Sequence, residues 1–216
     1  MPRHRVKRPY DASRRRAAAE RNRAAILRAA QRLFIARGYA ATTVADVARA
    51  AKVAVDTVYA SIGTKPALFR TLLEAAISGT GRAVPAEERD YVRAIRAEPD
   101  ARNKLTIYAQ ALRRIQERLA PLTRVLKDAA PGDKGLRRLW KTIADRRAAN
   151  MLRFATDLAA TGQLRTEVDV QQAADLIWAT NAPEFYLLLV GERAWSPASF
   201  EAWLARAWIR LLLDDD

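Results

Sequence analysis

Residues 43–62 read TVADVARAAKVAVDTVYASI, and this stretch decides the fold of the N-terminal part of the chain. Its first half carries apolar residues at the spacing of one helix face: Val44, Val47, Ala48 and Ala51. After a very short break around Lys52-Val53, the pattern resumes with Val58 and Ile62 one turn apart. Two short helices joined by so tight a turn must cross at a steep angle, which predicts a helix-turn-helix.

The second of these helices has an outer face suited to the major groove of DNA. The residues expected on that face are short or mixed in character: Val55, Asp56, Thr57, Tyr59 and Ala60. A helix fills the major groove almost completely, so bulky outward side chains would hinder docking. The small Ala48 lets the two helices approach each other, and Val53 and Val58 are expected to fill the angle between them.

Start and stop signals define the neighbouring helices. Gly38 ends a helix expected over 21–37, and Thr42 and Thr43 precede the next one, as N-caps should. The run 63–66, Gly-Thr-Lys-Pro, combines a stop, an N-cap and a proline in the first turn of a helix expected over 65–78.

Helical periodicity continues to the C-terminus without an alternating strand pattern, so the fold class is all-α, with about nine helices. The further helices are expected over 86–98, 101–119, 122–130, 133–161, 169–190 and 197–213. Pro121 separates two of them, and Pro183 should kink the segment 169–190. The domains expected are a basic, disordered tail over 1–19, a helix-turn-helix domain over 20–79 and a larger helical domain over 80–216.

Positive charge is concentrated at one end of the chain. Residues 1–70 hold 16 of the 38 Lys and Arg but 4 of the 24 Asp and Glu, so they carry +12 of the net charge of +14. Such asymmetry indicates a polyanionic partner for this part alone. Charge by itself leaves DNA, RNA and an anionic membrane open, and also a tail that only solubilises the protein.

Composition argues against an enzyme. The chain has no cysteine, and its one histidine, His4, lies in the arginine-rich tail, so no catalytic triad or soft metal site is expected. No pair of carboxylates is marked out by its spacing, and no cofactor is expected. Apolar runs such as Leu187–Val190 are far shorter than the roughly 18 residues that span a bilayer. Without a membrane span or a secretory signal, a cytoplasmic location is expected.

The stretch 38–48, GYAATTVADVA, resembles the start of the DNA-binding domain of the tetracycline-repressor (TetR) family. Thr57-Val58-Tyr59 followed by GTKPALF at 63–69 resembles its end. The resemblance covers about residues 22–70 at the usual spacing throughout. It implies a homodimeric bacterial transcriptional regulator whose second domain, residues 80–216, binds an effector and forms the dimer.

The resemblance also implies roles for single residues. Thr43, Tyr59 and Lys65 would contact DNA phosphates, and Val55, Asp56 and Thr57 would face base edges. For Asp56, capping of the recognition helix and repulsion of phosphates in wrong registers is an equal alternative. For Tyr59 the alternative is a half-buried core position.

Two positions depart from the family pattern. Lys52 stands where the turn usually has glycine, and a left-handed backbone there would cost lysine roughly 1 kcal/mol, offset in part by a contact with phosphate. Ile62 replaces a common aromatic residue and still fills the core.

The arginines nearest the domain are expected to act as an arm. Arg14, Arg15 and Arg16 are candidates for the minor groove or neighbouring phosphates, the alternative being a tail that only steers the protein by its charge.

The last helices carry more apolar surface than one chain buries easily, which predicts a two-fold interface. Its candidates are Phe185, Leu188, Phe200, Trp203, Leu204, Trp208 and Leu211. Core packing within one chain is the alternative.

The middle helices offer candidates for an effector pocket: Tyr108, Trp140, Asn150, Phe154, Trp178 and Asn181. Ordinary core positions are the alternative for each of them. Together these features favour a repressor that leaves a palindromic operator when a small molecule binds. An architectural DNA-binding protein of low specificity, using its basic tail, is the alternative.

Overall fold

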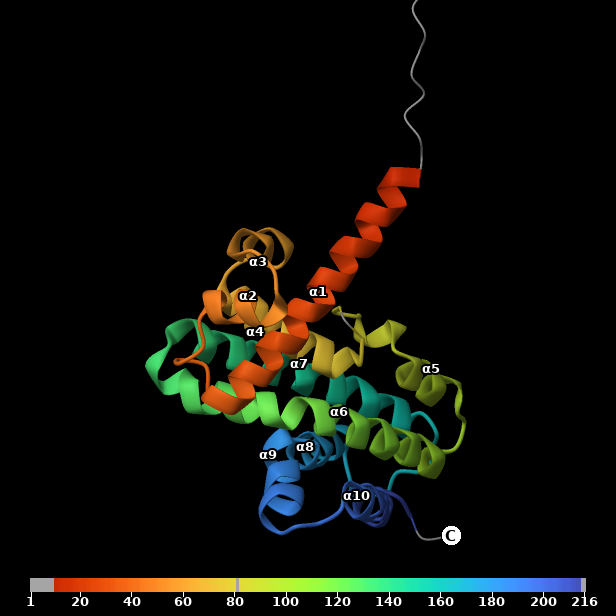
Figure 1. Cartoon of the computed structure of the whole chain (residues 1–216). Coiled ribbons are helices and arrows are strands. Elements are labelled where there is room, and N and C mark those ends of the chain that lie inside the picture. The colour runs from red at the N-terminus through yellow and green to blue at the C-terminus, as the bar shows by residue number, and fades with distance from the viewer. Residues whose placement is uncertain (1–9, 81, 215–216) are drawn as a thin grey trace, which may run out of the picture. The chain divides into compact units, whose positions relative to one another are not determined.

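The computed structural model describes residues 10–80 and 82–214, with side chains from Ser13 onward. The described chain is all-α, as predicted, and Figure 1 shows the arrangement of its helices. The α-helices are α1 (Tyr10–Arg37), α2 (Val44–Ala51), α3 (Val55–Ser61), α4 (Lys65–Ser78), α5 (Asp90–Ala97), α6 (Ala101–Ala129), α7 (Lys134–Ala159), α8 (Val170–Thr180), α9 (Pro183–Tyr186) and α10 (Pro197–Leu212). Short 3-10 turns η1 (Ala86–Glu88) and η2 (Ala130–Gly132) and a π-helical segment η3 (Leu187–Glu192) complete the order.

The chain divides into two compact units between Leu72 and Leu73. This boundary falls inside α4. The sequence analysis had placed it a few residues later, between residues 79 and 80, just after the end of that helix. Helix α4 is therefore shared: its first half belongs to the N-terminal unit and its second half to the C-terminal unit.

The N-terminal unit is built around an aromatic cluster. Phe34 of α1, Tyr39 of the following loop and Phe69 of α4 lie with ring centroids 5.1 to 5.6 Å apart. Val47 of α2 and Val58 of α3 are fully buried beside the apolar face of α1. The periodicity that predicted α2 and α3 thus corresponds to the face each helix buries.

Helix α1 begins at Tyr10, so the disordered tail expected over 1–19 differs from the structure from that residue onward. The run of three arginines and three alanines at 14–19 has high helix propensity, which explains why the helix extends so far. The first turns of α1 project beyond the other helices of the N-terminal unit (Figure 1). Residues 1–9 lie outside the described residues.

The C-terminal unit is organised by two long helices, α6 and α7, with α8 packed against α7 and α10 packed against α6; Figure 1 shows α6 and α7 running across the view. Its core is one continuous cluster in which Leu105 of α6, Leu158 of α7 and Ile177 of α8 are completely buried. None of the helices in the described part of the chain is both long and apolar enough to cross a membrane.

The break expected at Pro121 is wrong, because α6 continues through it. Proline lacks an N–H and costs a helix interior about 3 kcal/mol. Ala120 and Leu122 on either side are almost fully buried, as is Leu126 one turn further on. Burial of both halves against the same core offsets the loss, so the helix stays continuous.

The segment 169–190 was expected to be one kinked helix, but it is interrupted at Asn181 and Ala182. A residue before proline is disfavoured in the helical region, and Ala182 accordingly has φ −63° and ψ 138°. Pro183 then occupies the first turn of α9, where the missing N–H costs nothing.

Three of the residues proposed for the dimer interface lie inside the protomer instead. Phe200, Leu204 and Trp208 of α10 have no exposed surface, because they form the face of α10 that packs on the core. The indole of Trp208 stacks on Tyr108 at 5.4 Å and donates a hydrogen bond to Thr180 Oγ1 at 2.7 Å. The alternative of intrachain packing is therefore correct for these three.

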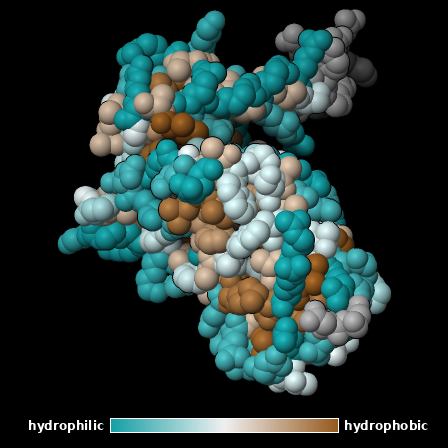
Figure 2. Space-filling view, turned by 90° about the horizontal axis from the view of Figure 1, so that it is seen from below, coloured by the Kyte–Doolittle hydropathy of each residue, from teal (hydrophilic) through white to brown (hydrophobic). Residues whose placement is uncertain are grey.

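The other four candidates remain at the surface. Leu188 and Leu211 are each 51% exposed, and Phe185 and Trp203 are half-buried with ring centroids 5.7 Å apart. Figure 2 views the molecule from the side of α8 to α10 and shows hydrophobic residues reaching the surface among hydrophilic ones.

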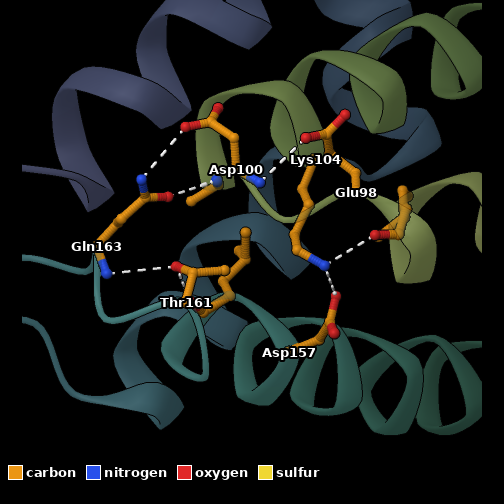
Figure 3. A network of polar contacts seen from close by, with 9 residues as sticks. Glu98, Asp100, Lys104, Asp157, Thr161 and Gln163 are labelled. Atoms are coloured by element: carbon orange, nitrogen blue, oxygen red, sulfur yellow. Dashed lines mark hydrogen bonds and ion pairs between the residues drawn. The ribbon is translucent and has the colours of Figure 1, made fainter.

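A polar network joins the end of α5, the start of α6 and the end of α7 (Figure 3). Lys104 is 3% exposed, and its ammonium donates to Ile95 O and to Asp157 Oδ2, each at 2.8 Å. Asp100 caps α6 by accepting from the Asn103 N–H, and this hydrogen bond is the main cause that lowers the pKa of its carboxyl.

Gln163 completes this network from the far side. Its side-chain oxygen accepts from the Ala101 N–H at 2.6 Å, and its amide nitrogen donates to Asp100 Oδ2 at 3.2 Å. The loop after α7 is thereby attached to the first turn of α6.

Replacing Asp157 by alanine is expected to lower the free energy of unfolding by about 2 to 3 kcal/mol, because it leaves the buried Lys104 ammonium without its counter-charge. Asp145→Ala is the matched control on the same helix. Asp145 pairs with Lys141, but these side chains are 62% and 77% exposed, so a loss of about 0.5 kcal/mol or less is expected. Chemical denaturation measures both variants, and equal losses would contradict the structural role of the Lys104–Asp157 pair.

Candidate nucleic-acid interface and effector cavity

The start of α2 is fixed by a reciprocal pair of caps. Thr43 Oγ1 accepts from the Asp46 N–H at 3.1 Å, and Asp46 Oδ2 accepts from the Thr43 N–H at 3.1 Å. The Thr43 hydroxyl also donates to Asp46 Oδ2 at 2.6 Å, and these bonds lower the pKa of the Asp46 carboxyl. Thr43 therefore has a capping role, and a donor bond to phosphate would require its hydroxyl to leave Asp46.

The turn between α2 and α3 depends on Lys52. Its backbone is left-handed, with φ 58° and ψ 42°, and the next N–H, that of Val53, closes on Ala48 O at 3.0 Å. A left-handed residue reverses the chain within one position, which is what a tight helix-turn-helix requires. Lys52 thus has the left-handed conformation that favours the glycine of the family pattern, and its side chain is exposed.

Helix α3 buries one side and exposes the other. Val58 has no exposed surface, whereas Val55 is 39% and Tyr59 is 50% exposed. Asp56 and Ala60 are exposed, and Thr57 is half-buried. Half of the Tyr59 surface is therefore accessible, and the other half is packed against the N-terminal unit.

The capping part of the alternative for Asp56 is wrong. The N-cap of α3 is Ala54, which makes no side-chain cap, and Asp56 lies in the first turn of the helix. A carboxylate in the first turn interacts favourably with the helix dipole, although it accepts no hydrogen bond from a free backbone N–H group. At the other end of α3, the Arg23 guanidinium donates to Ser61 O at 2.8 Å and so attaches the helix to α1.

Lys65 supports the loop before α2. Its ammonium donates to Ala40 O at 3.3 Å and lies 4.3 Å from the centroid of the Tyr39 ring. Thr42 fixes the same loop from inside, because it is completely buried and donates to Gly38 O at 2.9 Å. The contacts of Lys65 with Ala40 O and with the Tyr39 ring were not predicted from the sequence.

Half of the ten predicted DNA-contacting residues thus lie on α3 and the turn before it. Lys52, Val55, Asp56 and Tyr59 are exposed on neighbouring positions, while Arg14, Arg15 and Arg16 lie exposed on the first turns of α1. The arrangement offers a short, externally facing helix with cationic groups on the same unit.

The C-terminal unit contains a cavity of about 180 Å³. Its walls come from α5, α6 and α7, with Leu73 and Ile77 of α4 and Pro183 of α9. Most of its surface is apolar, with Leu112, Leu119 and Ile143 among the lining residues. Such a mostly apolar cavity with a few polar groups is typical of a small-molecule site.

One part of the cavity is polar. Gln116 and Asn181 are each 1% exposed, and Gln116 Nε2 donates to Asn181 O at 2.7 Å. Asn181 Nδ2 donates to the Tyr108 hydroxyl at 2.8 Å, and burial raises the pKa of that phenol above its usual value. Arg147 also lines this part, and burial lowers the pKa of its guanidinium.

Five of the six predicted pocket residues line this cavity: Tyr108, Trp140, Asn150, Phe154 and Asn181. Trp178 does not, because its indole points to Ala144 O at 3.4 Å and its ring lies under the Arg147 guanidinium at 4.6 Å. The sequence analysis missed Gln116 and Arg147. Gln116 had a signal, since it is a polar residue one turn after Leu112 on the apolar stripe of α6.

Residues 26–72 match the sequence model of the family described as bacterial regulatory proteins, tetR family. No curated protein matches the chain in a sequence search. The match includes α2, the Lys52 turn, α3 and the first half of α4. Over these residues, about a fifth of the chain, the protein is similar to the N-terminal domain of tetR-family regulators.

Solved structures share the fold over nearly the whole chain. NalD of Pseudomonas aeruginosa superimposes with a TM-score of 0.70 at 20% identity, covering 92% of this chain and 100% of NalD. FadR of Bacillus halodurans gives 0.68 at 18% identity, with coverages of 87% and 94%. SmeT in complex with triclosan gives 0.62 at 20% identity, with coverages of 90% and 92%. At these identities the likeness is one of fold.

Lys52 provides a test that separates backbone strain from charge. Lys52→Gly is expected to raise the free energy of unfolding by about 1 kcal/mol, because glycine adopts φ 58° without a steric penalty, whereas Lys52→Ala retains the strain. Both variants are expected to weaken DNA binding equally and to reduce its salt slope by about 1, as for one lost phosphate contact. Denaturation and salt-dependent DNA titrations measure the two effects. DNA binding that is unchanged in both variants would exclude Lys52 from the interface.

Proposed function

We propose that this protein is a repressor that binds a palindromic DNA operator as a homodimer and leaves it when a small molecule occupies the cavity. The observation that carries the proposal is the exposed outer face of α3, held by a left-handed turn and a capped neighbour. A rigid short helix with an exposed face is what insertion into the major groove requires. The family match at residues 26–72 supports the same reading.

Within this proposal, Val55, Asp56 and Thr57 face base edges. Val55 is suited to a thymine methyl group and Asp56 to a cytosine amino group. Tyr59 and Lys52 contact phosphates on either side, and these contacts set the position of α3 without reading sequence.

Thr43 and Lys65 are proposed to add phosphate contacts from the edge of the unit. An ammonium has three N–H groups, so Lys65 can donate to phosphate while it keeps Ala40 O. Arg14, Arg15 and Arg16 are proposed to act from a helical arm, not from a disordered one, since they lie on α1.

The dimer is proposed to form through the exposed apolar residues near η3 and α10. Leu188 and Leu211 are the most exposed large apolar side chains in this region. The half-buried Phe185 and Trp203 add further apolar surface. Two copies related by a two-fold axis would place two α3 helices about 34 to 36 Å apart, the repeat of B-DNA.

Release from DNA is proposed to pass through α4. Leu73 and Ile77, on the second half of α4, line the cavity, while the first half of the same helix belongs to the N-terminal unit. A ligand that favours another position of α4 changes the population of the DNA-binding conformation. NalD is a repressor of a multidrug efflux pump, and SmeT has been solved with triclosan, which supports a small-molecule effector here.

The proposal is tested by selecting bound sequences from a random duplex pool at near-physiological salt. An inverted repeat is expected, with half-sites about one DNA turn apart. Thr57→Ala is expected to relax the sequence preference within each half-site, whereas Tyr59→Phe, which loses one hydroxyl, should weaken binding to all sequences about equally. Binding without enrichment of any sequence would contradict the proposal and favour an architectural DNA-binding protein.

The dimer surface is tested by placing charge on it. Leu188→Arg combined with Leu211→Arg is expected to weaken the dimer by about a hundredfold in dissociation constant, because burying unpaired charges at an interface is costly. Leu152→Arg on α7 is the control, since Leu152 is 41% exposed but lies on another helix. Sedimentation at several concentrations measures the dissociation constant, and a dimer that is unaffected by the double variant would place the interface elsewhere.

A further inference from the structure

Two buried oxygen atoms at the cavity wall lack a hydrogen-bond donor. Among the described residues, neither Gln116 Oε1 nor Asn181 Oδ1 has a partner. The orientation of Gln116 is fixed, because only its amide nitrogen can donate to the backbone oxygen of Asn181. Its Oε1 is therefore an unpaired acceptor on a residue that lines the cavity.

The Arg147 guanidinium adds a donor to the same lining. Its Nη1 is buried and has no hydrogen-bond partner in the described part of the chain. The guanidinium lies against the face of the Trp178 ring, which holds it in place without using its N–H groups. Acceptors from two amides and a donor from an arginine thus line a cavity whose surface is mostly apolar.

The charge of the lining disfavours a cationic ligand. Two carboxylates, Glu87 and Asp157, face five arginines: Arg89, Arg96, Arg146, Arg147 and Arg153. Two lining residues are paired with partners outside the lining: Arg146 with Glu74, and Asp157 with Lys104. One pair neutralises a positive charge of the lining and the other a negative charge, so the net charge of the lining is unchanged. The excess of positive charge remains, and a ligand cation would enter against it.

We propose that the effector is an apolar molecule, neutral or weakly acidic, whose polar end carries a hydroxyl or amide N–H that donates to Gln116 Oε1 or Asn181 Oδ1. This inference rests on the proposed effector function and gives it a chemical class. The same polar end accepts from Arg147, while the apolar body packs against Leu112, Leu119 and Ile143. A molecule without a donor leaves the buried oxygens unpaired, which discriminates strongly against it.

Three probes of matched size test the class: 4-pentylphenol, its methyl ether and the 4-pentyl-N,N,N-trimethylanilinium ion. Isothermal titration of the full-length wild-type protein is expected to give the phenol about ten- to a hundredfold tighter binding than the ether, which lacks the donor. The cation is expected to bind more weakly still. These ratios are measured on the unaltered protein, so they do not depend on a variant that folds.

Gln116→Met then locates the contact, with Gln110→Met as its control. Both glutamines lie on α6, but Gln110 is exposed and does not line the cavity. The ratio of phenol to ether affinity is expected to fall severalfold in Gln116→Met and to stay unchanged in Gln110→Met. Thermal unfolding of both variants shows whether each is folded.

The outcomes separate this inference from the function on which it rests. Equal binding of phenol and ether, or tightest binding of the cation, overturns the ligand class, while any effect of bound probes on DNA affinity still supports an effector cavity. If no probe binds although the protein binds its selected DNA, both the ligand class and the effector role of the cavity are overturned, and the DNA-binding function remains.

Discussion

The left-handed turn at Lys52 is the constraint on which the DNA-binding arrangement depends. It ends α2 and lets α3 begin after only three intervening residues, so that Val58 is buried while Val55 and Tyr59 are exposed. A right-handed backbone at this position would continue α2 and remove the crossing of the two helices. The Thr43–Asp46 caps fix the other end of α2, and the bond from Arg23 fixes the end of α3. The exposed face of α3 is therefore set by backbone geometry, which leaves its side chains available for the proposed DNA contacts.

The C-terminal unit buries several polar side chains, which lowers its stability wherever they are not hydrogen-bonded. Gln116, Asn181 and Lys104 are almost fully buried, and burying polar groups is unfavourable unless they are paired. Lys104 is paired with Asp157 and Ile95 O, which joins α5, α6 and α7 around the cavity. Gln116 and Asn181 are only partly paired, and the proposed ligand would supply the hydrogen-bond donor that they lack. Buried polar groups thus have two different roles within the same unit.

The sequence predicted best where local chemistry decides the structure. The bounds of α2 and α4 follow from Thr43 and from the Gly-Thr-Lys-Pro run at 63–66, because caps and stops act within one turn. It failed where tertiary packing prevails over a local rule. Pro121 does not end α6, because the residues on both sides of it are buried. Phe200 and Trp208 of α10 pack into the core of the same chain, and helical periodicity alone does not distinguish such a buried face from a dimer interface. Gln116 was missed because a single polar residue on an apolar stripe indicates a ligand site only when its neighbour across the cavity, Asn181, is also known.

The central claim is that the outer face of α3 is the surface that reads DNA. Photo-crosslinking tests it most directly, with a photoreactive amino acid placed at Val55 of α3 and, in a separate protein, at Leu152 of α7, which is similarly exposed. The account predicts crosslinks from position 55 to bases within each half-site of the selected duplex, and none from position 152. Crosslinks from position 152, or a bound duplex that position 55 does not reach, would contradict it.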